Sequence, residues 1–150
     1  MRIEIVTDIE VFRPLGELWM QQHNTEDFGF DITVDDVMAD AKALIATGAG
    51  ACIGANFKGK WVGFMLVFVT QSFLGPQTIA VEKYWFAKPE QPMAGPLMLR
   101  EARLWAKRQG CSHLIMSASN LASAMHDKVC EFYEKAKLMK FETSYITEIN

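Results

Sequence analysis

The stretch TIAVEKYWFAKPEQPMAGPL, residues 78–97, decides the fold. Its first half, Thr78 to Phe86, is rich in β-branched and aromatic residues and predicts a strand. Lys88 to Pro92 contains two prolines and predicts a loop. An amphipathic pattern follows from Leu97 to Arg108, which predicts a helix that Gly110 ends. The stretch is therefore a strand that runs through a loop into the N-terminus of a helix.

A helix N-terminus of this kind can bind an anion. Its first main-chain amides have no partner within the helix, and the helix dipole adds positive potential. Pro96 suits the first helical position, where no donor is needed. Ala94 and Gly95 are small, so an anion can approach their backbone. The pattern indicates a phosphate site at Ala94–Leu97; the alternative is an ordinary strand–helix loop that binds nothing.

The rest of the chain alternates between strand and helix patterns. Before the deciding stretch we expect a strand, two helices and two strands, at residues 1–7, 12–23, 33–48, 51–57 and 61–69. After it we expect a strand, a helix and a terminal strand, at residues 112–118, 121–138 and 141–149. The order β-α-α-β-β-β-α-β-α-β predicts a mixed α+β fold with an antiparallel meander, in one domain spanning residues 1–150.

The composition excludes several classes of protein. Half of the 150 residues are hydrophobic, which excludes a disordered chain, and the net charge of −3 argues against a nucleic-acid partner. The cysteines are widely spaced and form no Cys/His cluster, so we expect no metal site. The N-terminus is too polar for a signal peptide, and the longest apolar run, Trp61 to Val69, is too short to cross a membrane. We therefore expect a cytoplasmic protein with no membrane partner.

The order of these elements resembles that of the GCN5-related N-acetyltransferases, the GNAT family. The resemblance covers Ile3 to Ile149 and is carried by Val62-Gly63, Glu82 to Glu90, Leu97 to Gly110 and Tyr133-Glu134-Lys135. It implies a central, mostly antiparallel, twisted sheet of about six or seven strands flanked by about four helices. It also implies that acetyl-CoA is the co-substrate and that the loop after the fourth strand holds its diphosphate.

The diphosphate loop departs from the family pattern. The family reads Gln/Arg-x-x-Gly-x-Gly/Ala, whereas this chain reads EQPMAG at residues 90–95, or QPMAGP one position later. The resemblance implies that the cofactor is bound by Phe86, Ala87, Gln91, Met93, Ala94, Gly95, Leu97 and Asn120. Phe86 and Ala87 would offer backbone groups to the pantetheine arm. Asn120 is alternatively the N-cap of the helix that follows it.

Two residues match the family's catalytic positions. Glu82 would accept the proton of the attacking amine, directly or through water, and partial burial would raise its pKa usefully. Tyr133 would protonate the departing thiolate. The alternatives are an exposed Glu82 paired with Lys83 or another lysine, and a core tyrosine with a satisfied hydroxyl.

The implied activity is an acetyl-CoA-dependent N-acetyltransferase that uses direct attack in a ternary complex, without a metal. The acceptor would be a small amine or a protein amine, which acidic residues between Glu26 and Asp36 would attract. We expect a monomer or a homodimer, with an apolar surface near Phe73 and Leu74 able to pair subunits.

Two alternatives stay open from the sequence. The atypical loop favours a catalytically silent GNAT-fold protein with a binding, inhibitory or structural role. An unrelated α+β ligand-binding domain would show no splay between the strands at residues 78–86 and 112–118.

Overall fold

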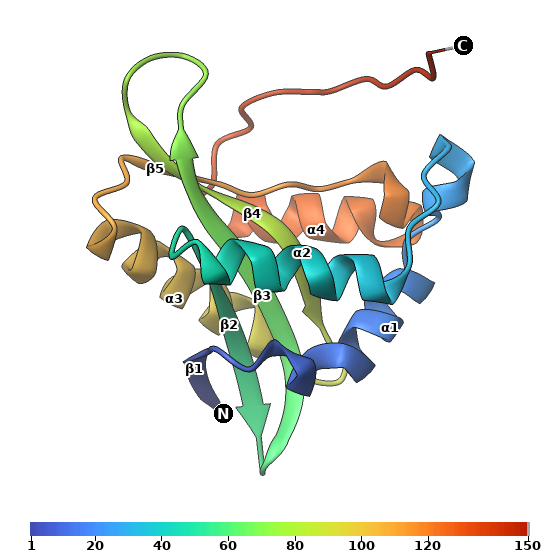
Figure 1. Ribbon diagram of the computed structural model, residues 1–150, viewed down its shortest axis with the longest axis vertical. Helices are drawn as coiled ribbons and strands as arrows, with labels where there is room; N and C mark the ends of the chain where they lie inside the picture. The colour runs from blue at the N-terminus through green and yellow to red at the C-terminus, as the bar shows by residue number, and fades with distance from the viewer. Residues whose placement is uncertain (150) are drawn as a thin grey trace.

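The computed structural model describes residues 1–149 and contains one five-stranded sheet in the order β1-β2-β3-β4-β5 (Figure 1). Neighbouring strands from β1 to β4 are antiparallel, whereas β5 runs parallel to β4. This confirms the mixed α+β fold with a mostly antiparallel sheet. The strands are β1 (Arg2–Val6), β2 (Gly50–Phe57), β3 (Lys60–Gln71), β4 (Thr78–Ala87) and β5 (His113–Ile115).

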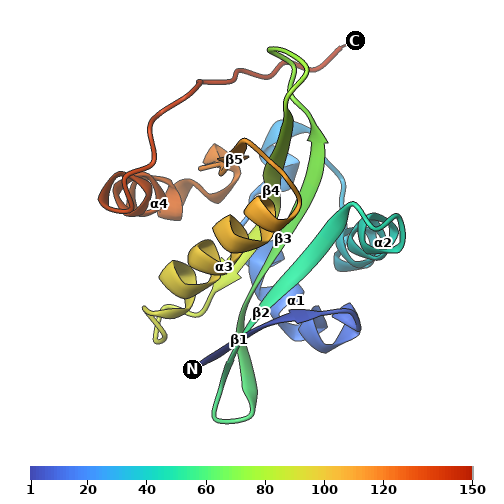
Figure 2. The ribbon, with the colours of Figure 1, turned by 90° about the vertical axis from the view of Figure 1, so that its left-hand side faces the viewer.

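Helices cover both faces of the sheet (Figure 2). α1 (Arg13–Gln21) and α2 (Val34–Ala46) lie on one face, and α3 (Ala94–Arg108) and α4 (Ser123–Lys135) lie on the other. Short 3-10 turns precede α1, separate α1 from α2 and precede α4, at Ile9–Phe12, Thr25–Phe28 and Asn120–Ala122.

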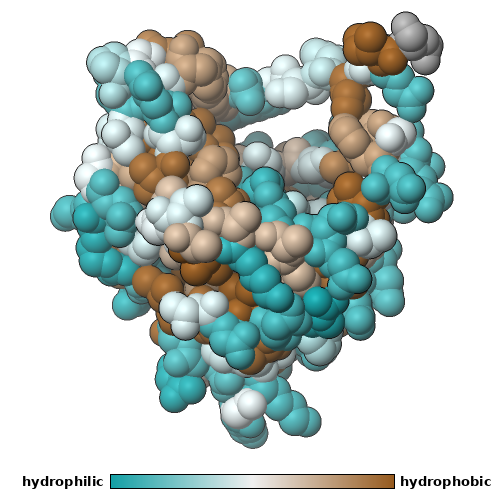
Figure 3. Space-filling model, in the orientation of Figure 1, coloured by the Kyte–Doolittle hydropathy of each residue, from teal (hydrophilic) through white to brown (hydrophobic). Residues whose placement is uncertain are grey.

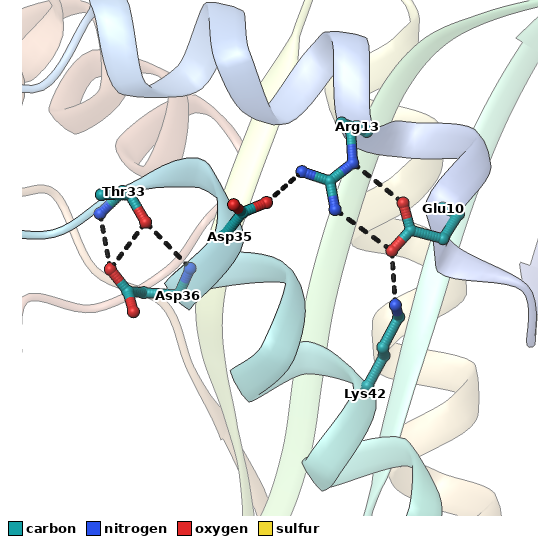
Figure 4. Close-up of polar contacts among 6 residues, drawn as sticks. All are labelled: Glu10, Arg13, Thr33, Asp35, Asp36 and Lys42. Atoms are coloured by element: carbon teal, nitrogen blue, oxygen red, sulfur yellow. Dashed lines mark hydrogen bonds and ion pairs between the residues drawn. The ribbon is translucent and has the colours of Figure 1, made fainter.

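The pair α1–α2 is fixed by polar contacts at its solvent side (Figure 4). Thr33 and Asp36 form a capping box, since the Asp36 amide donates to Thr33 Oγ1 and the Thr33 amide donates to the Asp36 carboxylate. Arg13 of α1 forms ion pairs with Glu10, in the turn before α1, and with Asp35 of α2. Lys42 of α2 pairs with Glu10 as well. These ion pairs hold the start of α2 against α1.

The sheet separates two hydrophobic cores. The core under α3 contains Ile53, Met65, Val67, Ala80, Met98 and Trp105. The core under α1 and α2 contains Phe12, Trp19, Met38, Phe64, Leu66 and Phe86. Alternate residues of β2 and of Phe64–Val67 in β3 supply the two cores, which is the two-residue period of a strand buried on both faces. In β4 the alternation reverses between Ala80 and Tyr84, where the register with β3 shifts.

The predicted terminal strand at Phe141–Ile149 is wrong. Residues 136–149 contain no helix or strand, so the described sheet has five strands rather than six or seven. The predicted alternation is present in the sequence, but a strand also needs a neighbour for its main-chain hydrogen bonds, and this segment has none. α4 ends at Lys135, and two residues later Lys137 adopts a positive φ of 60°.

Two other boundaries differ from the prediction. α3 begins at Ala94, so Pro96 is its third residue rather than its first. Proline fits there because its nitrogen still lies in the first turn, where no donor is needed. The fifth strand pairs only over His113–Ile115, although the sequence pattern continues to Ala118. No helix within residues 1–149 is long and apolar enough to span a membrane.

Gly54 of β2 allows two aromatic rings to pack against the backbone. A Cβ at this position would lie 2.6 Å from both the Phe12 and the Trp61 rings. We expect Gly54→Ala to lower the free energy of unfolding by about 1–3 kcal/mol, as overpacking in a core does. Gly16→Ala is the control, because its Cβ would meet Val34 at 3.3 Å in a helix that favours alanine. Urea unfolding of both variants measures the difference; equal stability would contradict this packing.

Candidate functional site

Strands β4 and β5 diverge after a short parallel ladder. The ladder joins Ile79–Val81 to His113–Ile115 and goes no further. From Glu82 to Ala87, the edge of β4 that faces away from β3 has no strand partner within residues 1–149. The splay that an unrelated α+β domain would lack is therefore present.

Glu82 lies at the point where the two strands separate. Its side chain is buried, with 8% of the residue exposed, and its Oε2 accepts a hydrogen bond from the Ser117 amide at 3.2 Å. Burial raises the pKa of Glu82 to about 7, which the Ser117 hydrogen bond only partly opposes. The alternative of an exposed Glu82 paired with Lys83 is wrong, because Lys83 pairs with Asp40 of α2 at 2.7 Å.

Tyr133 of α4 also binds Ser117. Its hydroxyl donates to the Ser117 carbonyl at 2.9 Å, and only 9% of the residue is exposed. Burial and the neighbouring Glu82 raise the pKa of the phenol. The structure therefore brings Glu82 and Tyr133 together at Ser117, where Glu82 binds the main-chain amide and Tyr133 binds the carbonyl. The Tyr133 hydroxyl thus has a protein partner.

Trp85 fills the space between these residues and the first turn of α3. Its ring stacks on Tyr133 at 5.9 Å between centroids and lies 5.5 Å from Phe132. A Cβ added to Gly95 would lie 3.0 Å from the indole, so the glycine allows this close packing. The indole Nε1 is buried without a hydrogen-bond partner in the described chain. Trp85 therefore lines the predicted anion site and offers one unused donor.

The first turn of α3 has fewer free amides than the sequence suggests. The Ala94 amide donates to the Gln91 carbonyl at 2.9 Å, and the Leu97 amide donates to the Met93 carbonyl at 3.2 Å. Pro96 has no amide hydrogen. Among residues 1–149, the amides of Met93 and Gly95 find no acceptor, so this turn can present those two donors to an anion.

The remaining predicted cofactor residues take different positions. Phe86 is buried in the core under α1 and α2, where it stacks on Phe64, so only its backbone can meet a ligand. Ala87 pairs with Gly63 at the end of β4. Asn120 is exposed in the turn before α4, and its alternative role as the N-cap is wrong because Ser119 caps that turn.

The acidic segment after α1 lies close to the splay. The Asn24 amide donates to the Leu121 carbonyl at 2.7 Å, which joins the loop before α2 to the loop before α4. Glu26, Asp27 and Asp31 follow Asn24, and none of them forms an ion pair within residues 1–149. Negative potential therefore collects beside the site. No group of side chains in that described range could hold a metal ion.

Sequence reasoning missed Ser117 and Trp85. Ser117 acts through its main chain, so no side-chain pattern could identify it. Trp85 belongs to a run of three aromatic residues in β4, and the sequence does not show which of them faces α3. Its pairing with Met65, which lies in the core under α3, places it on that side of the sheet.

The buried carboxyl of Glu82 should make stability depend on pH. Its pKa in the folded protein is about 7, above the ordinary value of 4.5. The folded state therefore keeps the proton at pH values where the unfolded chain has lost it. Stability should therefore fall as pH rises from about 4.5 to about 7, by at most about 1.4 kcal/mol per unit for one group. Glu82→Gln keeps an acceptor for Ser117 without a charge and should lose this slope. Urea unfolding across this pH range tests it; identical slopes in both proteins would contradict the assignment.

No protein-family model matches the chain, and no curated protein sequence matches it. Solved structures do match it over nearly its whole length. A ribosomal-protein-alanine N-acetyltransferase from Brucella melitensis biovar Abortus 2308 is 16% identical, with a TM-score of 0.72 over 99% of this chain and 100% of that one. An aminoglycoside N-acetyltransferase, AAC(6')-Iy, in complex with CoA is 13% identical, with a TM-score of 0.74 over 99% of both chains. A transcriptional regulator from Bacillus halodurans C-125 is 12% identical, with a TM-score of 0.72 over 99% of both. The chain therefore has the fold of the GNAT N-acetyltransferases, as the order of its elements predicts.

Proposed function

We propose that this protein is an acetyl-CoA-dependent N-acetyltransferase that acts on a primary amine. The observation that carries the proposal is the splay of β4 from β5 with Glu82 and Tyr133 meeting at Ser117. The structural neighbours support it, since two of them are named as N-acetyltransferases and one of these binds CoA. A single domain and a cytoplasmic location stay predictions.

The chain has groups that fit two parts of CoA, the pantetheine arm and the diphosphate. The edge of β4 from Glu82 to Ala87 offers unpaired main-chain groups to the amide-rich pantetheine arm, much as a neighbouring strand would. The Met93 and Gly95 amides lie at the N-terminus of α3 and suit the diphosphate. Gln91, which is half-buried in the same loop, supplies an amide side chain.

The acetyl transfer requires a neutral amine and a protonated leaving group. The acceptor nitrogen attacks the thioester carbonyl, the new C–N bond forms, and the C–S bond breaks. Glu82 takes the proton that the ammonium loses, and a pKa of about 7 suits a base that works near neutral pH. The thiolate takes its proton from Tyr133, whose hydroxyl must first leave the Ser117 carbonyl. The attacking nitrogen loses its second proton as the amide forms, and this proton restores the phenol.

A cationic acceptor fits the surroundings of the splay. Glu26, Asp27 and Asp31 lie in the loop that the Asn24–Leu121 hydrogen bond holds beside it. They would attract an ammonium group during its approach. A small amine and a protein amine meet this condition equally.

Trp85 supports a second candidate, a catalytically silent protein with a binding, inhibitory or structural role. The indole packs against Gly95 and Tyr133, where an approaching ligand would need space. One of the matched structures is named as a transcriptional regulator rather than an enzyme. Binding of acetyl-CoA and turnover distinguish the two candidates.

The first turn of α3 gives a test of binding. Met93 is 56% exposed, so Met93→Glu places a negative charge beside the Gly95 amide without disturbing the core. We expect this variant to bind acetyl-CoA at least 10-fold more weakly, about 1.4 kcal/mol, because the charge repels the diphosphate. Met93→Gln, which is uncharged and of similar size, should bind as the native chain does. Isothermal titration measures both; absence of heat with the native chain would favour the silent candidate.

Turnover tests the roles of the two buried groups. We expect Glu82→Gln to lower kcat/KM by about 10²-fold or more, the usual contribution of a general base, and to remove an apparent pKa near 7 from the pH profile. Tyr133→Phe should lower kcat without weakening acetyl-CoA binding.

Matched controls use exposed residues of the same type. Glu131→Gln and Tyr145→Phe change an exposed carboxylate and an exposed phenol and should leave turnover unchanged. Full activity in Glu82→Gln would exclude Glu82 as the base, whatever the outcome for binding.

A further inference from the structure

Trp85 contacts both ends of the candidate site. One edge of its indole lies against the first turn of α3, because a Cβ on Gly95 would be 3.0 Å from the indole Cζ2. Its other neighbours are on α4, where it stacks on Tyr133 with 24° between the ring planes and lies 5.5 Å from the Phe132 ring. The indole therefore bridges the space between α3 and α4.

A ligand that uses both ends of the site must pass this ring. The acid–base pair meets at Ser117, and the unpaired amides of Met93 and Gly95 lie at the edge of the indole. The free edge of β4, which connects these two places, includes Trp85 itself. Cavities of about 290 and 20 Å³ lie elsewhere, beside β5 and under α1 and α2. The indole thus occupies space that a pantetheine arm would require.

The position of the indole leaves one hydrogen bond unmade. Trp85 Nε1 is the only buried side-chain nitrogen or oxygen of residues 1–149 that has no hydrogen-bond partner. A buried donor without a partner lowers stability, because it has lost the hydrogen bond that water would give it. The indole recovers this bond when it turns toward water or toward an acceptor on a ligand. The unmade bond therefore lowers the free energy needed to move the ring.

The helix on one side of the indole is lightly anchored. Tyr133 is the only buried residue of α4, whereas seven residues of α3 are buried. The C-terminal end of α4 is joined to α3 by the hydrogen bond from Arg103 Nη2 to the Ala136 carbonyl at 3.0 Å. The chain that follows, residues 136–149, arches over an opening that separates it from the body of the molecule (Figure 3). α4 can therefore shift when the indole moves.

The stacked indole also restrains the phenol. The Tyr133 hydroxyl donates to the Ser117 carbonyl at 2.9 Å, so the protein itself uses the proton that a thiolate would need. Trp85 covers one face of the phenol ring and restricts its rotation away from that carbonyl. Departure of the indole would remove this restraint. One movement thus opens the route along β4 and frees the acid.

We propose that Trp85 is a gate that closes the cofactor site in the free protein and couples the entry of acetyl-CoA to the release of Tyr133. The incoming pantetheine arm displaces the indole, Nε1 gains an acceptor on the ligand or in water, and the phenol becomes free to protonate the thiolate. The gate rests on the proposed function, because it assigns a moving part to the same site. It differs from the silent candidate, in which the indole stays in place.

Nuclear Overhauser effects report the position of the indole in the native chain. In the free protein we expect cross-peaks from Trp85 Hζ2 to the Gly95 α-protons, and they should disappear when acetyl-CoA saturates the protein. Cross-peaks between the Phe12 and Trp61 rings, whose centroids are 4.8 Å apart, should remain. Trp85→Phe identifies the resonance, since it removes one of four indole signals. Trp85–Gly95 cross-peaks that persist at saturation would overturn the proposal.

Affinity tests the gate through the sign of the change. In Trp85→Leu the closed state no longer competes with the ligand, so we expect acetyl-CoA to bind about 10-fold more tightly or better. Trp85→Phe, which keeps a smaller ring, should lie between this variant and the native chain. Leu104→Ala, on the exposed face of α3, is the control and should bind as the native chain does. General damage to the site would weaken binding instead, and equal or weaker binding by both Trp85 variants would overturn the gate.

The gate and the proposed function fail in different ways. Binding by the native chain with no gain in either Trp85 variant would exclude the gate and leave the enzyme assignment intact. If neither the native chain nor Trp85→Leu binds acetyl-CoA at millimolar concentration, the proposed function is wrong and the gate is wrong with it. Binding by Trp85→Leu alone would support the gate. Urea unfolding identifies a variant that does not fold, and the measurement on the native chain then decides.

Discussion

The hydrogen bond from the Ser117 amide to Glu82 Oε2 is the interaction on which the site depends. Glu82 is one residue beyond Val81 and Ser117 is two residues beyond Ile115, the last ladder pair, so a carboxylate meets the chain where a neighbouring strand would otherwise continue. The strands separate around it, the edge of β4 is left unpaired, and the carboxyl is removed from water. Tyr133 is held at the same residue, because its hydroxyl donates to the Ser117 carbonyl. Strand geometry and acid–base properties therefore have one common origin.

Local signals predicted most of the fold. The strand–loop–helix stretch at residues 78–108 depends on signals within a few neighbours, and it forms as expected. The terminal strand failed for a physical reason. Alternation describes how a segment would present its side chains, but only a free neighbouring edge can satisfy its main chain, and local sequence carries no information about that edge.

The site was predictable to a lesser degree. The family resemblance selected Glu82 and Tyr133, and the structure places both at Ser117, although their roles stay predictions. It could not reveal that Trp85 packs on Gly95, because that contact joins a strand to a helix through the register of the sheet. The number of free amides in the first turn of α3 was equally hidden, since it depends on where the helix begins.

The separation of the two cores by the sheet has an evolutionary consequence. No buried residue is shared between the core under α3 and the core under α1 and α2, so a substitution in one affects the other only through the backbone of β2, β3 and β4. The helices α1 and α2 can therefore diverge to suit new partners while the opposite half stays constant. This independence gives a physical reason why one backbone tolerates sequences with so little in common.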